Sequence, residues 1–176
     1  MKVIFLDIDG VLNYEQLYTL NNYCYKTTKL DRGNISHVAV ERLARLVETT
    51  QAEIVITSSW RGLIQAYLQE SYFSKDVQTL LLLFAQYHIS IYDYTIPRVS
   101  GYYTDGTPFN RGYEVREWLS RHNDVTEFVI LDDEDFKDWY NLKDHLVQTD
   151  FYNYGLTNLH IEKAIHILGG DYNETI

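Results

Sequence analysis

The 176-residue sequence contains one cysteine and two prolines, and it lacks long apolar runs. Its one cysteine, Cys24, can form neither an internal disulfide nor a multi-thiolate metal site, and we expect it to be a small packed hydrophobe. Proline occurs only at Pro97 and Pro108. Because there is no linker rich in Pro, Gly or Ser, no internal repeat and no low-complexity tract, we expect residues 1–176 to form one domain.

No apolar run approaches the roughly 18–20 residues that a membrane span requires. The apolar start, MKVIFL, is interrupted by Asp7 and Asp9, well short of the apolar segment of a signal sequence. We therefore expect a cytoplasmic protein with no membrane partner.

Positive charge is also scarce, because 15 Lys and Arg residues face 25 Asp and Glu residues, for a net charge of −10. This balance argues against a general nucleic-acid coat, since affinity for phosphate backbones comes from clustered Lys and Arg. It is compatible with binding one phosphorylated end. Many of the 16 tyrosines gather in 13–25 and 90–103. They either pack under loops or, in part, line a substrate pocket and stack on a planar ring.

Short unbroken apolar runs predict the strands of the fold. Runs of this kind are typical of parallel strands that are covered on both faces. Between them, apolar residues at helical spacing predict amphipathic helices. The strands are expected at 3–6, 54–56, 128–131 and 145–147, and the helices at 35–47, 60–68 and 161–168.

Cap signals flank two of these helices. Asn34 or Ser36 can cap the first, and Thr157 or Asn158 can cap the last, which a glycine pair at 169–170 stops. Strands that alternate with helices predict an α/β fold with a doubly wound, Rossmann-like parallel sheet.

Two segments do not fit the alternation, at 14–33 and 95–110. We expect them to be small insertions that shape the substrate entrance. The Asp-Gly pair at 105–106 is a turn signal that could close a hairpin in the second of them.

Polar side chains directly follow three of the predicted strands. In open α/β sheets the carboxyl ends of the strands meet at one rim, where ligands bind. Each polar stretch also has an ordinary explanation by itself, as a turn, a helix cap, a surface charge or a solvated loop. The stretches are Asp7-Ile8-Asp9-Gly10, Thr57-Ser58-Ser59-Trp60-Arg61 and Asp132-Asp133-Glu134-Asp135.

The coincidence of these stretches at one rim implies a cation. Clustered carboxylates without a countercharge are costly or take up protons. Carboxylate oxygens, with waters and a phosphate, are the usual ligands of Mg²⁺. We therefore expect Mg²⁺ as the cofactor and a phosphorylated substrate beside it.

In their order along the chain, these motifs resemble those of the haloacid dehalogenase (HAD) superfamily of phosphotransferases. The four motifs are DIDGV at 7–11, the hydroxyl at 57, a basic residue before a helix, and DD at 132–133. The stretches FLDIDGVLN, ITSSWR, NRGYEVREWL, VILDDEDF and LVQTDFYNYGLT resemble a narrower group. That group is the HAD domains of multi-domain RNA repair proteins and their stand-alone relatives. Since no segment is long enough for an independent cap domain, at most a small cap or flap is expected.

The resemblance implies roles for the first two motifs. Asp7 would be the nucleophile that forms an aspartyl-phosphate, and Asp9 would be the general acid and base. Gly10 would let the backbone turn away from the phosphate. Thr57 would donate a hydrogen bond to a phosphoryl oxygen, with Ser58 assisting.

The resemblance also implies basic residues that bind phosphate. Arg111 is our choice for the third motif, where it would neutralise charge on the transferring group, and Lys137 and Arg116 are the competitors. Arg61 resembles an arginine of polynucleotide 3′-phosphatases and would grip the substrate phosphate bidentately.

In the fourth motif Asp133 would bind Mg²⁺ directly, and Asp132 would orient a water of the metal shell or a neighbouring backbone group. The Asp7 carboxylate and the Asp9 backbone carbonyl would complete the protein's share of the metal ligands. Asp150 either helps at the rim or is a turn carboxylate.

The resulting prediction is a Mg²⁺-dependent phosphomonoester hydrolase that acts on nucleotide or polynucleotide ends. A small-metabolite phosphatase of the same fold is the alternative, which the acidic surface favours, and a non-catalytic HAD-like module that binds a metal or ligand is a third. A histidine metal site is disfavoured, because no HExxH occurs and His160 and His166 do not share a helix face. The sequence leaves the oligomeric state and any partner repair domains open.

Overall fold

Five parallel strands form one sheet in the order β3-β2-β1-β4-β5. The structure is a computed structural model that describes residues 1–20, 34–97 and 100–170. This sheet confirms the predicted α/β fold with a Rossmann-like parallel sheet. The strands are β1 (Lys2–Leu6), β2 (Glu53–Ile56), β3 (Ile91–Tyr94), β4 (Glu127–Asp132) and β5 (Leu146–Gln148).

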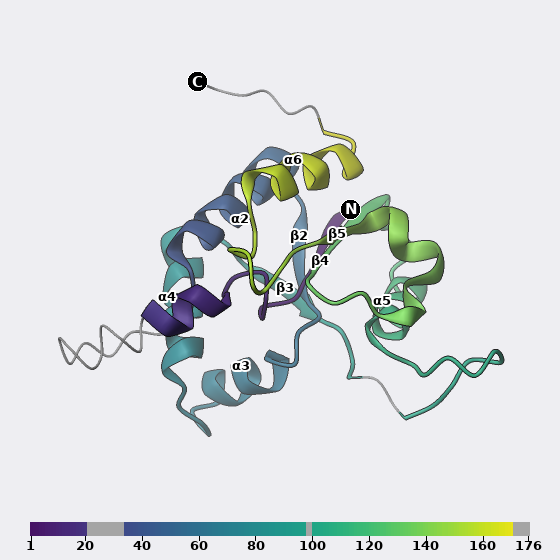
Figure 1. The fold of residues 1–176 in the computed structure, drawn as a ribbon, viewed down its shortest axis with the longest axis horizontal. Helices are drawn as coiled ribbons and strands as arrows, with labels where there is room; N and C mark the ends of the chain where they lie inside the picture. Colours follow the sequence, from purple (N-terminus) through teal and green to yellow (C-terminus); the bar gives the residue numbers. More distant parts are fainter. Residues whose placement is uncertain (21–33, 98–99, 171–176) are drawn as a thin grey trace.

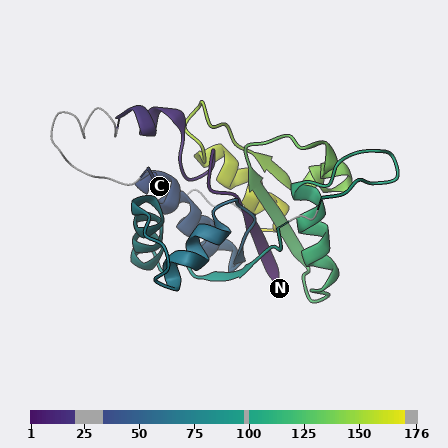
Figure 2. The same cartoon turned by 90° about the horizontal axis from the view of Figure 1, so that it is seen from below.

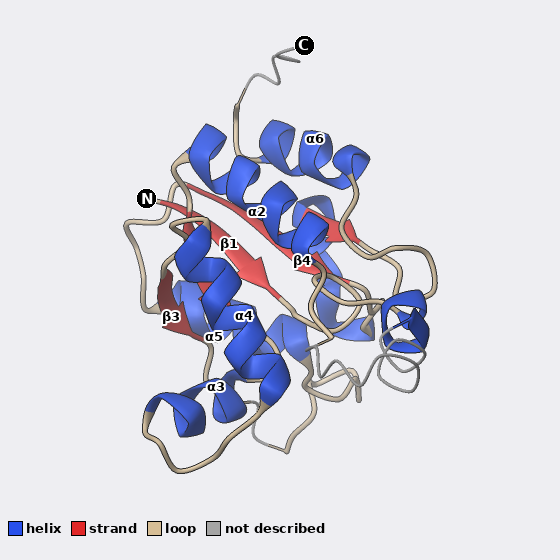
Figure 3. Ribbon diagram, turned by 90° about the vertical axis from the view of Figure 1, so that its left-hand side faces the viewer, coloured by secondary structure: helices blue, strands red, loops and turns tan. Residues whose placement is uncertain are grey.

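Helices cover both faces of the sheet, as Figures 1 and 3 show. The α2, α3, α4 and α6 helices share one apolar core with the sheet, and α5 and the 3₁₀ segment η1 share another. The bounds are α2 (His37–Thr50), α3 (Arg61–Leu68), α4 (Lys75–Gln86), α5 (Arg111–Ser120), η1 (Lys137–His145) and α6 (Asn158–Ile167).

The alternation of side chains along β1 explains why its apolar run is unbroken. Ile4 and Leu6 point into the core under α2, α4 and α6, whereas Val3 and Phe5 point into the core under α5 and η1. All four are fully buried. A strand with two covered faces needs apolar residues at every position.

The caps resolve two alternatives that the sequence left open. Ser36 is the N-cap of α2, where its side chain accepts a hydrogen bond from the Ala39 amide. Thr157 is the N-cap of α6. Gly169 follows that helix with a φ of +66°, so the predicted stop is confirmed.

Neither β3, α4 nor η1 was expected from the sequence. The β3 strand, IYDY, pairs only with β2 at the edge of the sheet and is mostly half-exposed, so it has no unbroken apolar run. In α4 four consecutive leucines, at 80–83, hide the helical period.

The predicted insertions are described in part. Residues 21–33, with Cys24, and residues 98–99 lie outside the described residues. Residues 15–20 are helical, and the hairpin around the Asp-Gly pair is confirmed by an antiparallel bridge between Tyr102 and Pro108. This hairpin projects from the body of the molecule beside α5 (Figure 2). That 1–176 is one domain, with insertions at 14–33 and 95–110, stays a prediction.

Within the described ranges, no helix has the length and apolar character needed to cross a membrane.

Candidate active site

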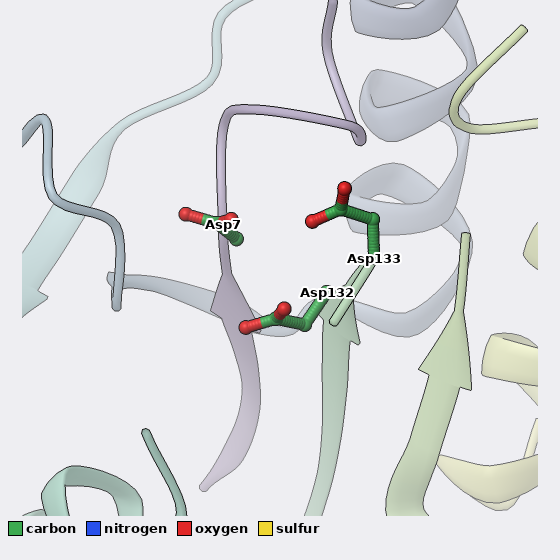
Figure 4. A group of neighbouring side chains, drawn as sticks. All are labelled: Asp7, Asp132 and Asp133. Carbon is green, nitrogen blue, oxygen red and sulfur yellow. The ribbon is translucent and has the colours of Figure 1, made fainter. Parts of the chain in front are cut away.

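Three carboxylates converge at the carboxyl ends of the two central strands. One oxygen from each of Asp7, Asp132 and Asp133 lies within 4.8 Å of the other two. The register explains the meeting, because Leu6 of β1 pairs with Leu131 of β4, and the residues that follow emerge side by side. Figure 4 shows the three carboxylates pointing toward one another from the ends of these strands.

Burial makes this arrangement unfavourable for three negative charges. It raises the pKa of Asp132 well above its ordinary value, and the Asp7 carboxylate raises it further. Burial likewise raises the pKa of Asp7, which Arg111 and a Ser58 hydrogen bond partly oppose. Burial, followed by repulsion from Asp7, raises the pKa of Asp133 to about 6.

The residues fit a divalent cation. Asp7 Oδ1 and Asp132 Oδ2 are buried and have no hydrogen-bond partner among the described residues. Carboxylate oxygens are hard donors, and a divalent ion among the three that converge would compensate their burial and their repulsion.

Gly10 leaves the space that the third carboxylate occupies. A Cβ at this position would lie 2.2 Å from Cγ and Oδ2 of Asp133, and the φ of Gly10 is +71°. Both the contact and the left-handed backbone require glycine here.

The Asp9 carboxylate is not one of this group of three and is held by two side-chain donors. Trp60 Nε1 donates to Asp9 Oδ2 (2.8 Å), and Asn13 Nδ2 donates to Asp9 Oδ1 (2.7 Å). Asn13 Oδ1 also accepts from the Gly10 amide, so the loop after β1 is held together by this side chain. Metal binding through the Asp9 carbonyl stays a prediction.

Thr57 and Ser58 follow β2 and are fully buried beside β1. The Thr57 amide donates to Leu6 O (2.9 Å), while its hydroxyl has no hydrogen-bond partner among the described residues. The Ser58 side chain accepts from the Trp60 amide and lies beside Asp7, where it helps to lower the pKa of that carboxyl. Thr57 therefore keeps a hydroxyl for a ligand.

Arg111, the first residue of α5, faces the acids. Its NH2 lies 3.8 Å from Asp7 Oδ1, and its Nε lies 3.6 Å from Asp132 Oδ2. Nε has no hydrogen-bond partner among the described residues. The competitors lie elsewhere: Arg116 donates to Tyr103 and to the Asp138 carbonyl, and Lys137 has no contact with the acid group within the described part of the chain.

Arg61, at the start of α3, forms a buried ion pair with Glu114 of α5. Its NH1 and NH2 donate to the two Glu114 carboxylate oxygens at 2.7 and 3.0 Å, and NH1 also donates to Thr95 Oγ1 (2.6 Å). The structure therefore pairs the Arg61 guanidinium with a protein carboxylate, whereas the sequence predicted a contact with the substrate phosphate.

A buried aspartate from η1 fixes the start of α5. Asp138 accepts hydrogen bonds from the amides of Asn110, Gly112 and Tyr113 at 2.7–3.3 Å. The N-cap residue, Asn110, makes no side-chain cap of its own. Asp138 thus satisfies the first turn of the helix that carries Arg111.

Asp150 is engaged in its own turn. It accepts from the Tyr152 amide (2.7 Å) and from Asn153 Nδ2 (2.6 Å), and these bonds lower its pKa. A cavity of about 390 Å³ lies beside it and beside Asp133, and Glu134 adds a further carboxylate to its lining. Asp150 therefore makes the contacts of a turn carboxylate, which was one of the two roles expected for it.

Several of the clustered tyrosines pack on other aromatic rings. Between ring centroids, Tyr14 lies 5.9 Å from Tyr154, Tyr18 lies 6.0 Å from Phe151, and Tyr103 lies 4.6 Å from Phe109. Stacking on a substrate ring stays a prediction.

Sequence reasoning missed four residues that hold the site in place: Asn13, Trp60, Glu114 and Asp138. For Glu114 there was a signal, because it follows Arg111 by three residues and so shares its helix face. For Asp138 there was none, because its partners lie more than 20 residues away along the chain.

A parallel sheet with aspartates after β1, a buried threonine after β2, and paired aspartates after β4 define the HAD class of proteins. The family described as the HAD domain in Swiss Army Knife RNA repair proteins matches residues 3–161, and the chain belongs to this family. Searches of the curated proteins and of the solved structures gave no match.

Proposed function

We propose that the protein is a Mg²⁺-dependent phosphomonoester hydrolase that works through an aspartyl-phosphate on Asp7. The observation that carries the proposal is the convergence of Asp7, Asp132 and Asp133, with the Arg111 guanidinium facing them. Family membership supports a HAD-type phosphatase in general.

Asp7, Asp132 and Asp133 would hold the cation, with the Asp9 carbonyl as the further ligand that the resemblance implies. When bound, Mg²⁺ supplies positive charge that offsets the carboxylates and the phosphoryl oxygens. Asp132 is fully buried, so it is suited to orienting neighbouring groups from below the site.

In the first step a carboxylate oxygen of Asp7 attacks phosphorus, and the bond from phosphorus to the leaving oxygen breaks. Ser58 and Arg111 favour the ionised form of Asp7, which is the form that attacks. Asp9 gives its proton to the leaving oxygen. Thr57 Oγ1 and the guanidinium of Arg111 bind the phosphoryl oxygens, where negative charge is carried through the transition state.

In the second step a water molecule attacks the phosphorus of the aspartyl-phosphate, and the bond between phosphorus and Asp7 breaks. Asp9 takes the proton of the attacking water and returns to its starting state. Trp60 and Asn13 fix the Asp9 carboxylate through their two N–H donors.

We propose a nucleotide or polynucleotide end as the substrate, because the matching family is described from RNA repair proteins. A small-metabolite phosphatase is the second candidate. The acidic cavity of about 390 Å³ beside Asp133 favours it, because carboxylates in its lining, such as Glu134, repel a long polyanion. A cytoplasmic location stays a prediction.

The test is phosphate release in Mg²⁺ from p-nitrophenyl phosphate, nucleoside monophosphates and a 3′-phosphorylated oligonucleotide, compared side by side. Faster turnover of the oligonucleotide supports the proposed substrate. Faster turnover of the mononucleotide favours the second candidate. If none of them releases phosphate, the proposed function fails.

Asp7→Asn separates an enzyme from a binding module. The variant should lose essentially all turnover while its thermal unfolding stays cooperative, because the amide is no nucleophile. Asp144→Asn, at an exposed carboxylate, is the matched control and should turn over like the wild type. Equal turnover in Asp7→Asn and the wild type would contradict the mechanism.

A further inference from the structure

Both terminal nitrogens of Arg61 are engaged within the protein. They meet the two oxygens of Glu114 in parallel, at 2.7 and 3.0 Å. This bidentate geometry is the one by which arginine also recognises a phosphate. A substrate phosphate would therefore have to displace Glu114 to take the same place.

Displacing Glu114 is unfavourable because the carboxylate is buried. Glu114 is 1% exposed and Arg61 is 7% exposed, so bulk water has little access to replace a lost partner. A buried carboxylate without its partner keeps its desolvation penalty and loses the compensating attraction. Arg61 is thus better suited to holding Glu114 than to gripping a phosphate.

Glu114 in turn holds Arg111. Arg111 NH1 donates to Glu114 Oε2 at 3.3 Å, and Arg61 NH1 donates to the same oxygen. The distances from Arg111 to Asp7 and Asp132, 3.8 and 3.6 Å, are longer than hydrogen bonds. Without the hydrogen bond to Glu114, attraction by Asp7 and Asp132 would move the Arg111 guanidinium toward these two carboxylates. The guanidinium would then block the Asp7 carboxylate, which is the nucleophile.

We propose that Glu114 is a positioning residue for catalysis, which Arg61 anchors, and which holds the Arg111 guanidinium back from Asp7 so that it can meet the phosphoryl group. Arg61 then contributes to turnover through Glu114 and Arg111 and does not touch the substrate. The inference rests on the proposed function and replaces the direct phosphate contact that the sequence predicted for Arg61.

The experiment compares the wild type, Glu114→Met, and the double variant Arg61→Met with Glu114→Met. Methionine approximates the length of both side chains, and the double variant leaves no buried charge without a partner, so it keeps the comparison open if a single variant unfolds. For each protein, kcat/KM for p-nitrophenyl phosphate and the inhibition constant of inorganic phosphate are measured in Mg²⁺. Glu114→Gln, alone and with Arg61→Met, takes the place of Glu114→Met if thermal unfolding shows that the methionine variant is not folded.

A positioning role predicts a loss of at least tenfold in kcat/KM for Glu114→Met. It also predicts that the double variant matches Glu114→Met within twofold, both in kcat/KM and in phosphate inhibition, because Arg61 makes no contact of its own with the substrate. A double variant with tenfold weaker phosphate inhibition than Glu114→Met would show that Arg61 grips the phosphate, and would overturn the inference. Wild-type turnover in Glu114→Met would overturn it as well.

Glu117→Met is the matched control. Glu117 lies on the same helix, in an exposed ion pair with Arg121, and its loss should change kcat/KM by less than twofold.

A failure of the proposed function can be told apart from a failure of this inference. If the wild type releases no phosphate, the proposed function is wrong, whereas an active wild type with an equally active Glu114→Met refutes only the inference.

Discussion

Replacing Gly10 by alanine should weaken Mg²⁺ binding by displacing the Asp133 carboxylate. The new Cβ would lie 2.2 Å from Cγ and Oδ2 of Asp133, where ordinary contacts begin at 3.4 Å. The carboxyl group therefore has to move by roughly 1 Å or more. A magnesium–oxygen bond of about 2.0–2.1 Å does not tolerate such a shift, so we expect the loss of one ligand and at least ~10-fold weaker binding. At saturating Mg²⁺, this is about 1.4 kcal/mol less stabilisation by the ion.

The substitution also places alanine at a φ of +71°, which costs roughly 1–2 kcal/mol by itself. Gly169→Ala is the matched control, because its φ is +66° and a Cβ there meets nothing within 4 Å. Urea unfolding with EDTA should show similar losses of unfolding free energy for both variants. Calorimetric titration with Mg²⁺ should then show weakened binding in Gly10→Ala alone. Equal Mg²⁺ affinity in the two variants would refute the assignment of Asp133 as a ligand.

Three further predictions concern pH and capping. Because the pKa of Asp133 is raised from 3.8 to about 6, protonation stabilises the metal-free fold fully below pH 3.8, and this stabilisation is lost between pH 3.8 and about 6. Mg²⁺ affinity should rise as the pH rises through 6, because the carboxyl then ionises without the ion. Denaturation with EDTA at pH 5, where part of the stabilisation remains, and at pH 7.5 measures the first effect, and the same pair with Mg²⁺ measures the second; equal stability at the two pH values with EDTA would contradict the shift. Asp138→Ala should lower the free energy of unfolding by about 2 kcal/mol or more, because it leaves the Asn110 and Gly112 amides without an acceptor and the Tyr113 amide with the Asn110 carbonyl alone, whereas loss of the single Ser36 cap should cost about 1 kcal/mol. Similar urea midpoints for the two variants would argue against the capping role. Burial lowers the pKa of His160, which accepts a hydrogen bond from the Thr157 amide, so stability should fall as the pH drops below about 6.5. His160→Gln keeps an acceptor for the cap and should remove this fall in thermal midpoint between pH 7.5 and 5.5; an unchanged slope would refute the role of His160.

The strands that were predicted and the one that was missed differ in burial. The runs at 3–6, 54–56 and 128–131 became β1, β2 and β4, the three central strands, whose two covered faces demand continuous apolar residues. The edge strand β3 carries Asp93 and half-exposed side chains, because one of its sides needs no partner strand. An unbroken apolar run therefore predicts a strand only where the side chains of that strand are buried.

The polar residues of the active site that lie at the strand ends could likewise be predicted. Asp7, Thr57 and Asp133 directly follow buried strands and Asp132 ends one, and the geometry of a parallel sheet brings residues at such positions to one rim. Their meeting could therefore be predicted from the sequence. Family membership agrees with that prediction, since the match extends over residues 3–161.

The sequence alone was enough for the fold class, for four of the five strands and for the acids at the strand ends, because these depend on short-range patterns of polarity. The partner of each arginine was decided by tertiary structure. Arg61 and Glu114 lie 53 positions apart, and their pairing depends on how α3 and α5 approach the sheet from its two faces. A guanidinium binds a phosphate and a carboxylate with the same geometry, so only the packing of these helices determines which of the two it meets.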